Sequence, residues 1–289
     1  MHLITAIIFI LFIGIFGLFP FFLLYLFSDF IYILFHYVFK YRQKVILKNL
    51  NDTICKGQPE KAKTLLKGVH LNLTDILLEG IKSFSMSKSQ ITKRHKITNP
   101  EILIPYLEKN KSIIAVAAHY ANWEWGSFSA SLQTKYNVVG FYKPMSNKWI
   151  DSIMRKSRSK HGTTLASIKE TSLTFEKYRE IPSLFLMAAD QNPAQESKTI
   201  WVDFLGVETA FLNGPEKHAR NNDYPVFYVD VQRVKRGYYT VELSLLADNP
   251  NELAYGEITK RYADKLASVI DKNPCDWLWS HKRWKMKRK

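Results

Sequence analysis

Cysteine is scarce in this chain of 289 residues, which contains only Cys55 and Cys275. The two thiols lie far apart in the sequence and no CxxC pair occurs, which excludes a cysteine-rich structural zinc site. Nothing suggests a disulfide framework, as is typical of a main domain in a reducing compartment. The GxSxG turn that exposes a nucleophilic serine in many hydrolases is also missing.

Charged residues are absent from residues 3–27, LITAIIFILFIGIFGLFPFFLLYLF. A membrane-spanning helix needs about 20 apolar residues, so this segment is long enough. It has neither a basic start nor a small-x-small cleavage site, which favours a retained anchor over a removed signal peptide. Pro20 would kink the segment or separate a spanning helix from an interfacial one. We therefore predict a membrane anchor over residues 1–39 and a main domain over residues 40–289.

Acidic residues are outnumbered, with 26 Asp and Glu against 41 Lys and Arg, so the formal net charge is +15. This excess favours an anionic partner: nucleic acid, an anionic membrane surface, or an acidic or phosphorylated substrate. The second apolar stretch, FIYILFHYVF, is followed by a basic cluster, which favours a main domain on the cytoplasmic face and in contact with anionic headgroups. The cluster consists of Lys40, Arg42, Lys44 and Lys48. A monotopic hairpin in one leaflet is the alternative to a spanning anchor.

Apolar runs of strand length alternate with amphipathic stretches from about residue 112 onward. Strands are predicted over residues 112–118, 137–142, 163–168, 183–189, 199–204, 225–231 and 238–246. Helical segments are predicted over residues 41–92, 122–134, 147–160, 170–179, 213–222 and 251–272. This alternation predicts an α/β fold with a mostly parallel central sheet and helices on both faces. The later strands crowd together, so part of the sheet can be antiparallel.

A histidine follows the apolar run from Ser112 to Ala118, and Glu124 stands five positions after it. Reactive residues of a parallel sheet collect at the carboxyl ends of its strands. Asn122 is a good N-cap, so a helix that begins after it places Glu124 in its first turn. His119 with a carboxylate behind it can act as a general base of fixed tautomer. Because no enzyme nucleophile is evident, the base would activate an incoming hydroxyl; the alternative is a purely structural hydrogen bond.

Six ordered segments match the pattern of one enzyme family. They are YRQKVILKNL at 41–50, AAHYANWEWGS at 117–127, FYKPMSN at 141–147, ADQNP at 189–193, WVDFLGVETAFLNGPEKHAR at 201–220 and NPCDWLWSHKRWK at 273–285. HYANWE fits the H-x4-[DE] motif of the lysophospholipid and lipid A acyltransferase superfamily. The whole set resembles the late lipid A biosynthesis acyltransferases, the lauroyl and myristoyl transferases of Gram-negative inner membranes. H-x4-E alone is a weak motif, whereas the ordered set covers nearly the whole chain.

The resemblance implies an acyltransferase with a glycerolipid-acyltransferase-like fold on the cytoplasmic face of the bacterial inner membrane. The acyl donor would be acyl carrier protein or acyl-CoA, and the acceptor a hydroxyl of a phosphorylated glycolipid, a lipid A precursor. His119 would be the base and Glu124 its orienting acid. The resemblance implies no metal and no cofactor.

Asp190 ends the apolar run 183–189 in the same topological position as the histidine. It therefore competes with Glu124 as the carboxylate paired to that base. Gln191 and Asn192 could hold the acceptor sugar or the thioester oxygen, or simply close a turn. Asn122 is a third candidate for substrate contact beside its role as N-cap.

Basic residues near strand ends suit phosphate recognition or oxyanion stabilisation. Lys143 ends one predicted strand, and Arg155 and Arg158 lie on the helix that follows. We expect at least one of the three to face the cleft and the others to be surface charges. Asn213 and Arg220 flank the start of another helix, whose free backbone N–H groups could bind a phosphate or an oxyanion.

Rival functions remain open. One rival acylates another lipid, such as a phosphatidylinositol mannoside, an aminolipid or a lysophospholipid. A second is a non-catalytic lipid-binding protein on the same fold. A nucleic-acid binder is least favoured, since much of the basic charge lies beside the anchor and in the C-terminal segment WLWSHKRWKMKRK. There, tryptophans mixed with Lys and Arg suit a headgroup interface, or else packing with a solubilising tail.

Overall fold

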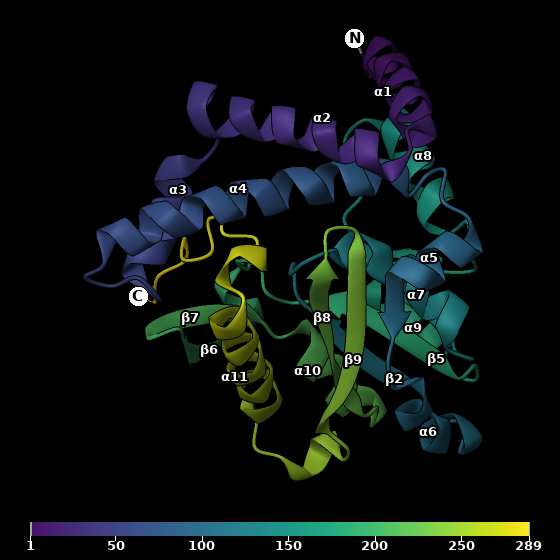
Figure 1. Cartoon of the computed structure of the whole chain (residues 1–289). Coiled ribbons are helices and arrows are strands. Elements are labelled where there is room, and N and C mark those ends of the chain that lie inside the picture. Colours follow the sequence, from purple (N-terminus) through teal and green to yellow (C-terminus); the bar gives the residue numbers. More distant parts are fainter. Residues whose placement is uncertain (1, 289) are drawn as a thin grey trace.

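A computed structural model describes residues 2–288 as an α/β fold around a seven-stranded sheet (Figure 1). Among these strands every pair is parallel except β8 with β9, in the order β1-β9-β8-β2-β5-β3-β4. The predicted α/β class with a mostly parallel sheet is confirmed. The strands are β1 (His95–Ile97), β2 (Ile113–Ala117), β3 (Asn137–Tyr142), β4 (Thr164–Ser167), β5 (Ser183–Ala188), β8 (Val226–Lys235) and β9 (Tyr238–Ala247).

Helices pack around this sheet and account for most of the remaining described chain. They are α1 (His2–Leu18), α2 (Phe21–Ile33), α3 (Gln43–Asp52), α4 (Pro59–Lys82), α5 (Lys88–Arg94), α6 (Ile104–Glu108), α7 (Gly126–Gln133), α8 (Lys148–Arg158), α9 (Thr171–Lys177), α10 (Gly214–Asn222) and α11 (Glu257–Lys272). Short helical turns are η1 (Leu34–Val38, π-type), η2 (Pro100–Leu103), η3 (Trp123–Trp125), η4 (Glu196–Lys198), η5 (Pro250–Glu252) and η6 (Pro274–Asp276).

Both faces of the sheet are covered, as predicted, and β2 lies at its centre between β5 and β8. Successive strand residues face opposite sides of a sheet. Ala115 accordingly faces Ala130 of α7, while Val116 faces Pro215 of α10 and Ile258 of α11. The carboxyl end of β2 therefore opens at the middle of one sheet edge, where parallel α/β sheets place their ligands.

One predicted strand lies outside the central sheet. Strand β6 (Thr199–Phe204) pairs antiparallel with β7 (Val207–Leu212) to form a separate hairpin. Leu205 and Gly206 make its two-residue turn, both with positive φ, as a type I′ turn requires. Strand β7 was not predicted, because Leu-Gly is a weaker turn signal than Asn-Gly and polar residues interrupt the apolar run of the strand. Strand β1 was not predicted either, since it is only three residues long.

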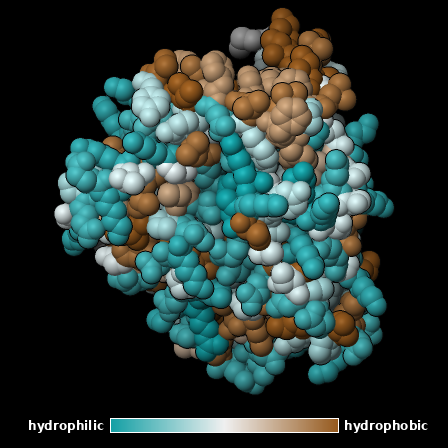
Figure 2. All heavy atoms as spheres, viewed as in Figure 1, coloured by the Kyte–Doolittle hydropathy of each residue, from teal (hydrophilic) through white to brown (hydrophobic). Residues whose placement is uncertain are grey.

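The apolar N-terminus forms two helices that meet at an angle. Helix α1 ends at Leu18 and Pro20 precedes the first turn of α2. A run of helix from Phe21 to Val38 is long and apolar enough to cross a membrane. In Figure 1, α2 lies alongside α4 and α1 points away from the body. Figure 2 shows hydrophobic residues gathered over these two helices.

Helix α2 has two distinct sides. Leu24 and Ser28 are buried against the body. The opposite side leaves large apolar side chains in contact with solvent: Phe22, Leu23, Leu26, Phe30 and Ile33. An exposed apolar strip of this size marks an interaction surface.

Candidate active site

The loop after β2 carries His119 at the central edge of the sheet. It is fixed against the segment that follows α11, because Leu278 N donates to His119 O at 3.1 Å and Ala121 N donates to Asp276 O at 2.8 Å. Ala121 has a φ of 46°, a left-handed conformation that is unfavourable for a residue with a Cβ. Such strain persists where surrounding contacts over-determine the backbone, which happens most often at functional sites.

Asp190 is the carboxylate that pairs with His119. In the β2–β5 ladder Ala117 is opposite Ala188, so the two residues emerge side by side at the same edge. Asp190 Oδ1 accepts from His119 Nδ1 at 2.7 Å, and Asp190 Oδ2 accepts from the His119 backbone N at 2.9 Å. Trp277 Nε1 also donates to Oδ2, at 2.9 Å. The carboxylate is thus fully engaged, and it fixes the histidine tautomer with the proton on Nδ1.

The pair has strongly perturbed protonation. Burial by itself would raise the pKa of Asp190, but the His119 charge and the hydrogen bonds from His119 and Trp277 lower that pKa to about 2. Burial likewise would lower the pKa of His119, but the charge and hydrogen bond of Asp190, with the charge of Glu124, raise that pKa above its usual value. The His119 side chain is 21% exposed and Asp190 only 2%. A substrate can therefore reach the histidine but not the carboxylate.

Gln191 lies on the open side of His119. Its side-chain Nε2 is 3.2 Å from His119 Nε2, so the amide donates to the ring nitrogen left free by Asp190. Asn192 is held more rigidly. Its backbone N donates to His281 Nε2 at 3.0 Å, and its Oδ1 accepts from Met286 N at 2.9 Å. The structure thus places Gln191 at the base and Asn192 beside the C-terminal segment.

Glu124 pairs with an arginine rather than with the histidine. Arg158 Nη2 donates to both carboxylate oxygens of Glu124, at 2.7 and 3.1 Å. Within residues 2–288 Glu124 makes no hydrogen bond to His119, so the orienting contact implied by the family pattern belongs to Asp190. Of the three basic residues predicted to bind phosphate, Arg158 is the one that contacts the loop bearing His119, through its bonds to Glu124. Lys143 and Arg155 are exposed, and Arg155 lies 6.0 Å from the Tyr142 ring.

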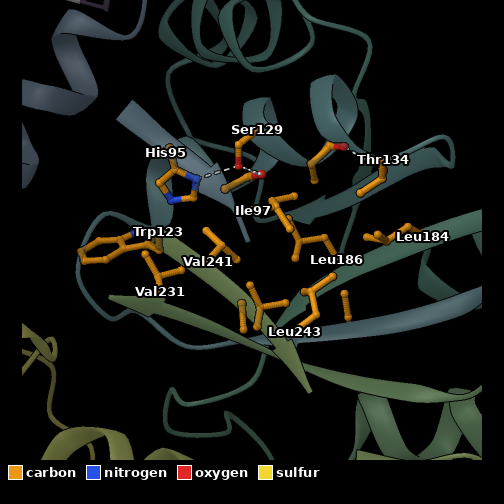
Figure 3. Close-up of a pocket in the computed structure, with 15 residues that line it drawn as sticks. His95, Ile97, Trp123, Ser129, Thr134, Leu184, Leu186, Val231, Val241 and Leu243 are labelled. Atoms are coloured by element: carbon orange, nitrogen blue, oxygen red, sulfur yellow. Dashed lines mark hydrogen bonds between the residues drawn. The ribbon is translucent and has the colours of Figure 1, made fainter. Parts of the chain in front are cut away.

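An apolar cavity lies between the sheet and α7 (Figure 3). The Trp123 ring lies 5.3 Å from the His119 ring, centroid to centroid, and forms one end of the cavity. The small side chains of Ala115, Ala117 and Ala130, together with Gly126, leave the interior of the cavity open. The lining comprises His95, Ile97, Ala115, Ala117, Trp123, Gly126, Ser129, Ala130, Thr134, Leu184, Leu186, Val229, Val231, Val241 and Leu243, around an empty volume of about 510 Å³ that includes space open to solvent.

His95 is the one ionisable side chain in that lining, and it is uncharged. Burial lowers the pKa of His95 to about 4. Its Nδ1 is 2.7 Å from the Ser129 hydroxyl, and its Nε2 donates to the Asn122 carbonyl oxygen at 3.2 Å. Both ring nitrogens are satisfied, so the cavity wall is electrically neutral and suits a hydrocarbon chain.

A family model for the bacterial lipid A biosynthesis acyltransferases matches residues 1–286. The chain belongs to this family. It is therefore an enzyme, an acyltransferase of lipid A biosynthesis, and its family is associated with membranes. No curated protein matches the chain in sequence.

Three other residues predicted to contact substrate have hydrogen-bond partners other than His119 within the described residues. Asn122 is fully buried, and its side chain donates to Glu79 and accepts from Trp125 N, which does not favour a substrate contact. Arg220 bonds Glu216 and the carbonyl oxygens of Leu253 and Ala254. Asn213 precedes α10, where its backbone N donates to Lys198 O at 3.1 Å.

Two residues that contact the site of this acyltransferase, Trp277 and His281, were not predicted from the sequence. Trp277 was considered for a headgroup interface or for packing, yet it is 2% exposed and donates to Asp190. His281 was not considered at all. The bridge between Tyr120 and Trp277 brings this distant segment to the base, and no local signal reveals that contact. Residues 2–288 contain no group of three or more His, Cys, Asp or Glu placed to hold a metal ion.

Proposed function

We propose that the chain transfers a fatty acyl group from a thioester to a hydroxyl of a lipid A precursor, with His119 as the general base. The observation that carries this proposal is the His119–Asp190 pair, whose histidine ring lies 5.3 Å, centroid to centroid, from Trp123, a residue that lines an apolar cavity. The donor is acyl carrier protein or acyl-CoA, and the acceptor is a phosphorylated glycolipid. No nucleic acid takes part.

The chemistry needs one proton acceptor and no enzyme nucleophile. Neutral His119 holds its proton on Nδ1, towards Asp190, and accepts the acceptor hydroxyl's proton at Nε2. The Gln191 amide must move aside for this, since it occupies the same position. The hydroxyl oxygen attacks the thioester carbonyl, the C–S bond breaks, and the protonated histidine returns its proton to the leaving thiolate. Asp190 stabilises the imidazolium formed between these steps.

The cavity beneath α7 suits the acyl chain. Trp123, whose ring contacts that of His119, lies at one end of the cavity, and Thr134 and Leu184 lie at the opposite end (Figure 3). Gly126, the first residue of α7, and Thr134, the residue that follows α7, both line the cavity, and eight residues of helix span about 12 Å at 1.5 Å per residue. An extended chain lying along α7 would place its carboxyl carbon near His119. The length of this cavity then sets which acyl chains fit.

Arg158 is the best-placed residue for a phosphate of the acceptor. It is held beside the catalytic loop by Glu124, and its side chain remains 25% exposed. Only its Nη2 is used in that pair, so the other N–H groups can contact an anion. Lys143 and Arg155 are left as surface charges in this proposal.

The N-terminal helices would hold the enzyme at the cytoplasmic face of the bacterial inner membrane. Residues 1–39 form the anchor and residues 40–289 the catalytic domain. The exposed apolar side of α2 supports contact with lipid. Its other side is bound to α4, so α2 would lie in the interface and α1 would insert more deeply. Lys40, Arg42 and Lys44, just after the anchor, would meet anionic headgroups.

The decisive experiment is acyl transfer by the purified full-length chain in detergent or vesicles. Acyl carrier protein and CoA thioesters are each offered with a lipid A precursor, and products are identified by mass spectrometry. A mass increase of one acyl group, absent with His119→Ala, is expected. Acylation of another lipid instead would favour the rival acceptor. No transfer to any lipid, with lipid binding intact, would favour a lipid-binding protein on this fold.

A further inference from the structure

Glu79 is a buried carboxylate that takes no part in the reaction described above. It lies near the end of α4 with no solvent exposure. Burying a carboxylate is costly unless its oxygens are hydrogen-bonded. Here three donors from three elements satisfy it: Tyr25 OH at 2.7 Å from α2, Asn122 Nδ2 at 2.5 Å from the catalytic loop, and Tyr239 OH at 2.7 Å from β9.

On one side Glu79 holds the catalytic loop. Asn122, which donates to it, also accepts from Trp125 N at 3.1 Å and so caps the turn that contains Glu124. Trp125 Nε1 adds a second contact, to the Glu79 carbonyl oxygen at 3.0 Å. Two hydrogen bonds, from the side chains of Asn122 and Trp125, thus hold the segment between His119 and Trp125 to Glu79 of α4.

On the other side Glu79 holds the membrane-facing helix. Tyr25 lies on the body side of α2, and Phe22 and Leu26 on the exposed side. The Tyr25 hydroxyl is packed so closely that a Cβ on Gly237 would come within 2.1 Å of it. Its hydrogen bond to Glu79 is therefore geometrically well determined, and any movement of α2 away from α4 must break it.

We propose that Glu79 is a positioning residue that makes the order of the catalytic loop depend on docking of α2 against α4. A membrane that takes up the apolar side of α2 would then keep the loop in its active conformation. The effect on turnover rests on the proposed acyl-transfer function. The effect on loop order does not.

The chain offers a matched pair of variants. Tyr25→Phe removes one hydrogen bond from α2 to a buried carboxylate of α4, and that carboxylate touches the catalytic loop. Ser28→Ala removes an equivalent 2.7 Å bond from α2 to Asp75, which is also held by Arg233 and Arg236 and does not contact the loop. Both variants lose a similar docking contact. Only Tyr25→Phe disturbs Glu79.

Steady-state kinetics in vesicles test the effect on turnover. For Tyr25→Phe we expect kcat to fall about three- to tenfold, the typical net effect of losing one hydrogen bond. KM for the acyl donor should not change, and Ser28→Ala should leave kcat as in wild type. Asn122→Ser keeps a capping oxygen but cannot reach Glu79. The effects on kcat of Tyr25→Phe and Asn122→Ser should be non-additive. Equal effects of Tyr25→Phe and Ser28→Ala, or full additivity, would overturn the proposal.

Amide hydrogen exchange gives a second readout that needs no activity. Peptides covering residues 119–125 should exchange about three- to tenfold faster in Tyr25→Phe than in wild type, and at the wild-type rate in Ser28→Ala. If wild type transfers no acyl group while exchange follows this pattern, the proposed function fails and the link through Glu79 stands. Unchanged exchange in Tyr25→Phe overturns the link, whatever the activity.

Discussion

Two carboxylates, Asp190 and Glu124, act on His119, and their surroundings differ sharply. Asp190 is buried, accepts three hydrogen bonds and contacts His119 directly. Glu124 is 27% exposed and is bound to Arg158. The H-x4-E spacing draws attention to Glu124, whereas the histidine is oriented by a residue 71 positions away. The motif spacing identified the loop that carries His119, but the carboxylate that contacts His119 is Asp190, which follows the neighbouring strand β5.

The difference separates two tasks. A buried, fully hydrogen-bonded carboxylate can fix a tautomer and stabilise an imidazolium, because it cannot relax towards solvent. A half-exposed carboxylate that holds an arginine can present that arginine to a charged ligand. The following predictions test this division, beginning with the residue that both carboxylates influence.

The largest loss is expected for His119→Ala. Removing the base should lower kcat by roughly 10²–10⁴-fold, the usual contribution of general-base catalysis. Thermal unfolding and membrane association should stay as in wild type. A variant that retains more than about a third of the wild-type rate would show that His119 is not the base.

Asp190→Asn should be the next most damaging change and should exceed Glu124→Gln. The asparagine removes the charge that raises the pKa of His119, so that pKa should fall. His119 must be neutral to act, so activity rises with pH through its pKa. The acid limb of the kcat/KM profile should therefore move to lower pH, while the maximum falls about 100-fold.

Glu124→Gln is the control for that profile, since Glu124 acts on His119 only by charge. Its acid limb should move in the same direction but by less. If Glu124→Gln moved the limb more than Asp190→Asn, the division between the two carboxylates would be reversed.

Arg158→Ala should affect the acceptor more than the donor. Loss of a charge-assisted phosphate contact should raise the apparent KM for the phosphorylated acceptor about tenfold. KM for the acyl thioester should stay within about twofold, and Lys143→Ala and Arg155→Ala serve as surface-charge controls. An unchanged acceptor KM in all three variants would move phosphate recognition elsewhere in the chain.

The smallest effect is expected at the far end of the cavity. Thr134→Leu should favour acyl chains shorter by one or two methylenes, with a change in preference of about fourfold per methylene. Competition between thioesters of different length, analysed by mass spectrometry, measures this ratio. An unaltered ratio would show that the chain does not lie along α7.

Much of the fold could be predicted because its signals are local. Apolar runs of strand length located β2, β3, β5, β8 and β9, and their alternation with amphipathic segments predicted a mostly parallel sheet. The hairpin β6–β7 was found only in part, since the strand run in Val207–Leu212 is interrupted by polar residues. The crowding of the later strands left antiparallel pairing possible, and β8 pairs antiparallel with β9.

The sequence by itself determined which residues reach the active edge of the sheet. His119 and Asp190 each follow a buried strand, and parallel strands end at a common edge. Only the tertiary structure decided that Asp190 contacts the imidazole and that Glu124 faces Arg158. The reason is that side-chain contacts depend on the positions of neighbouring strands and helices. The cavity has the same origin, because Ala115 and Ala130 leave a space only where β2 and α7 face each other.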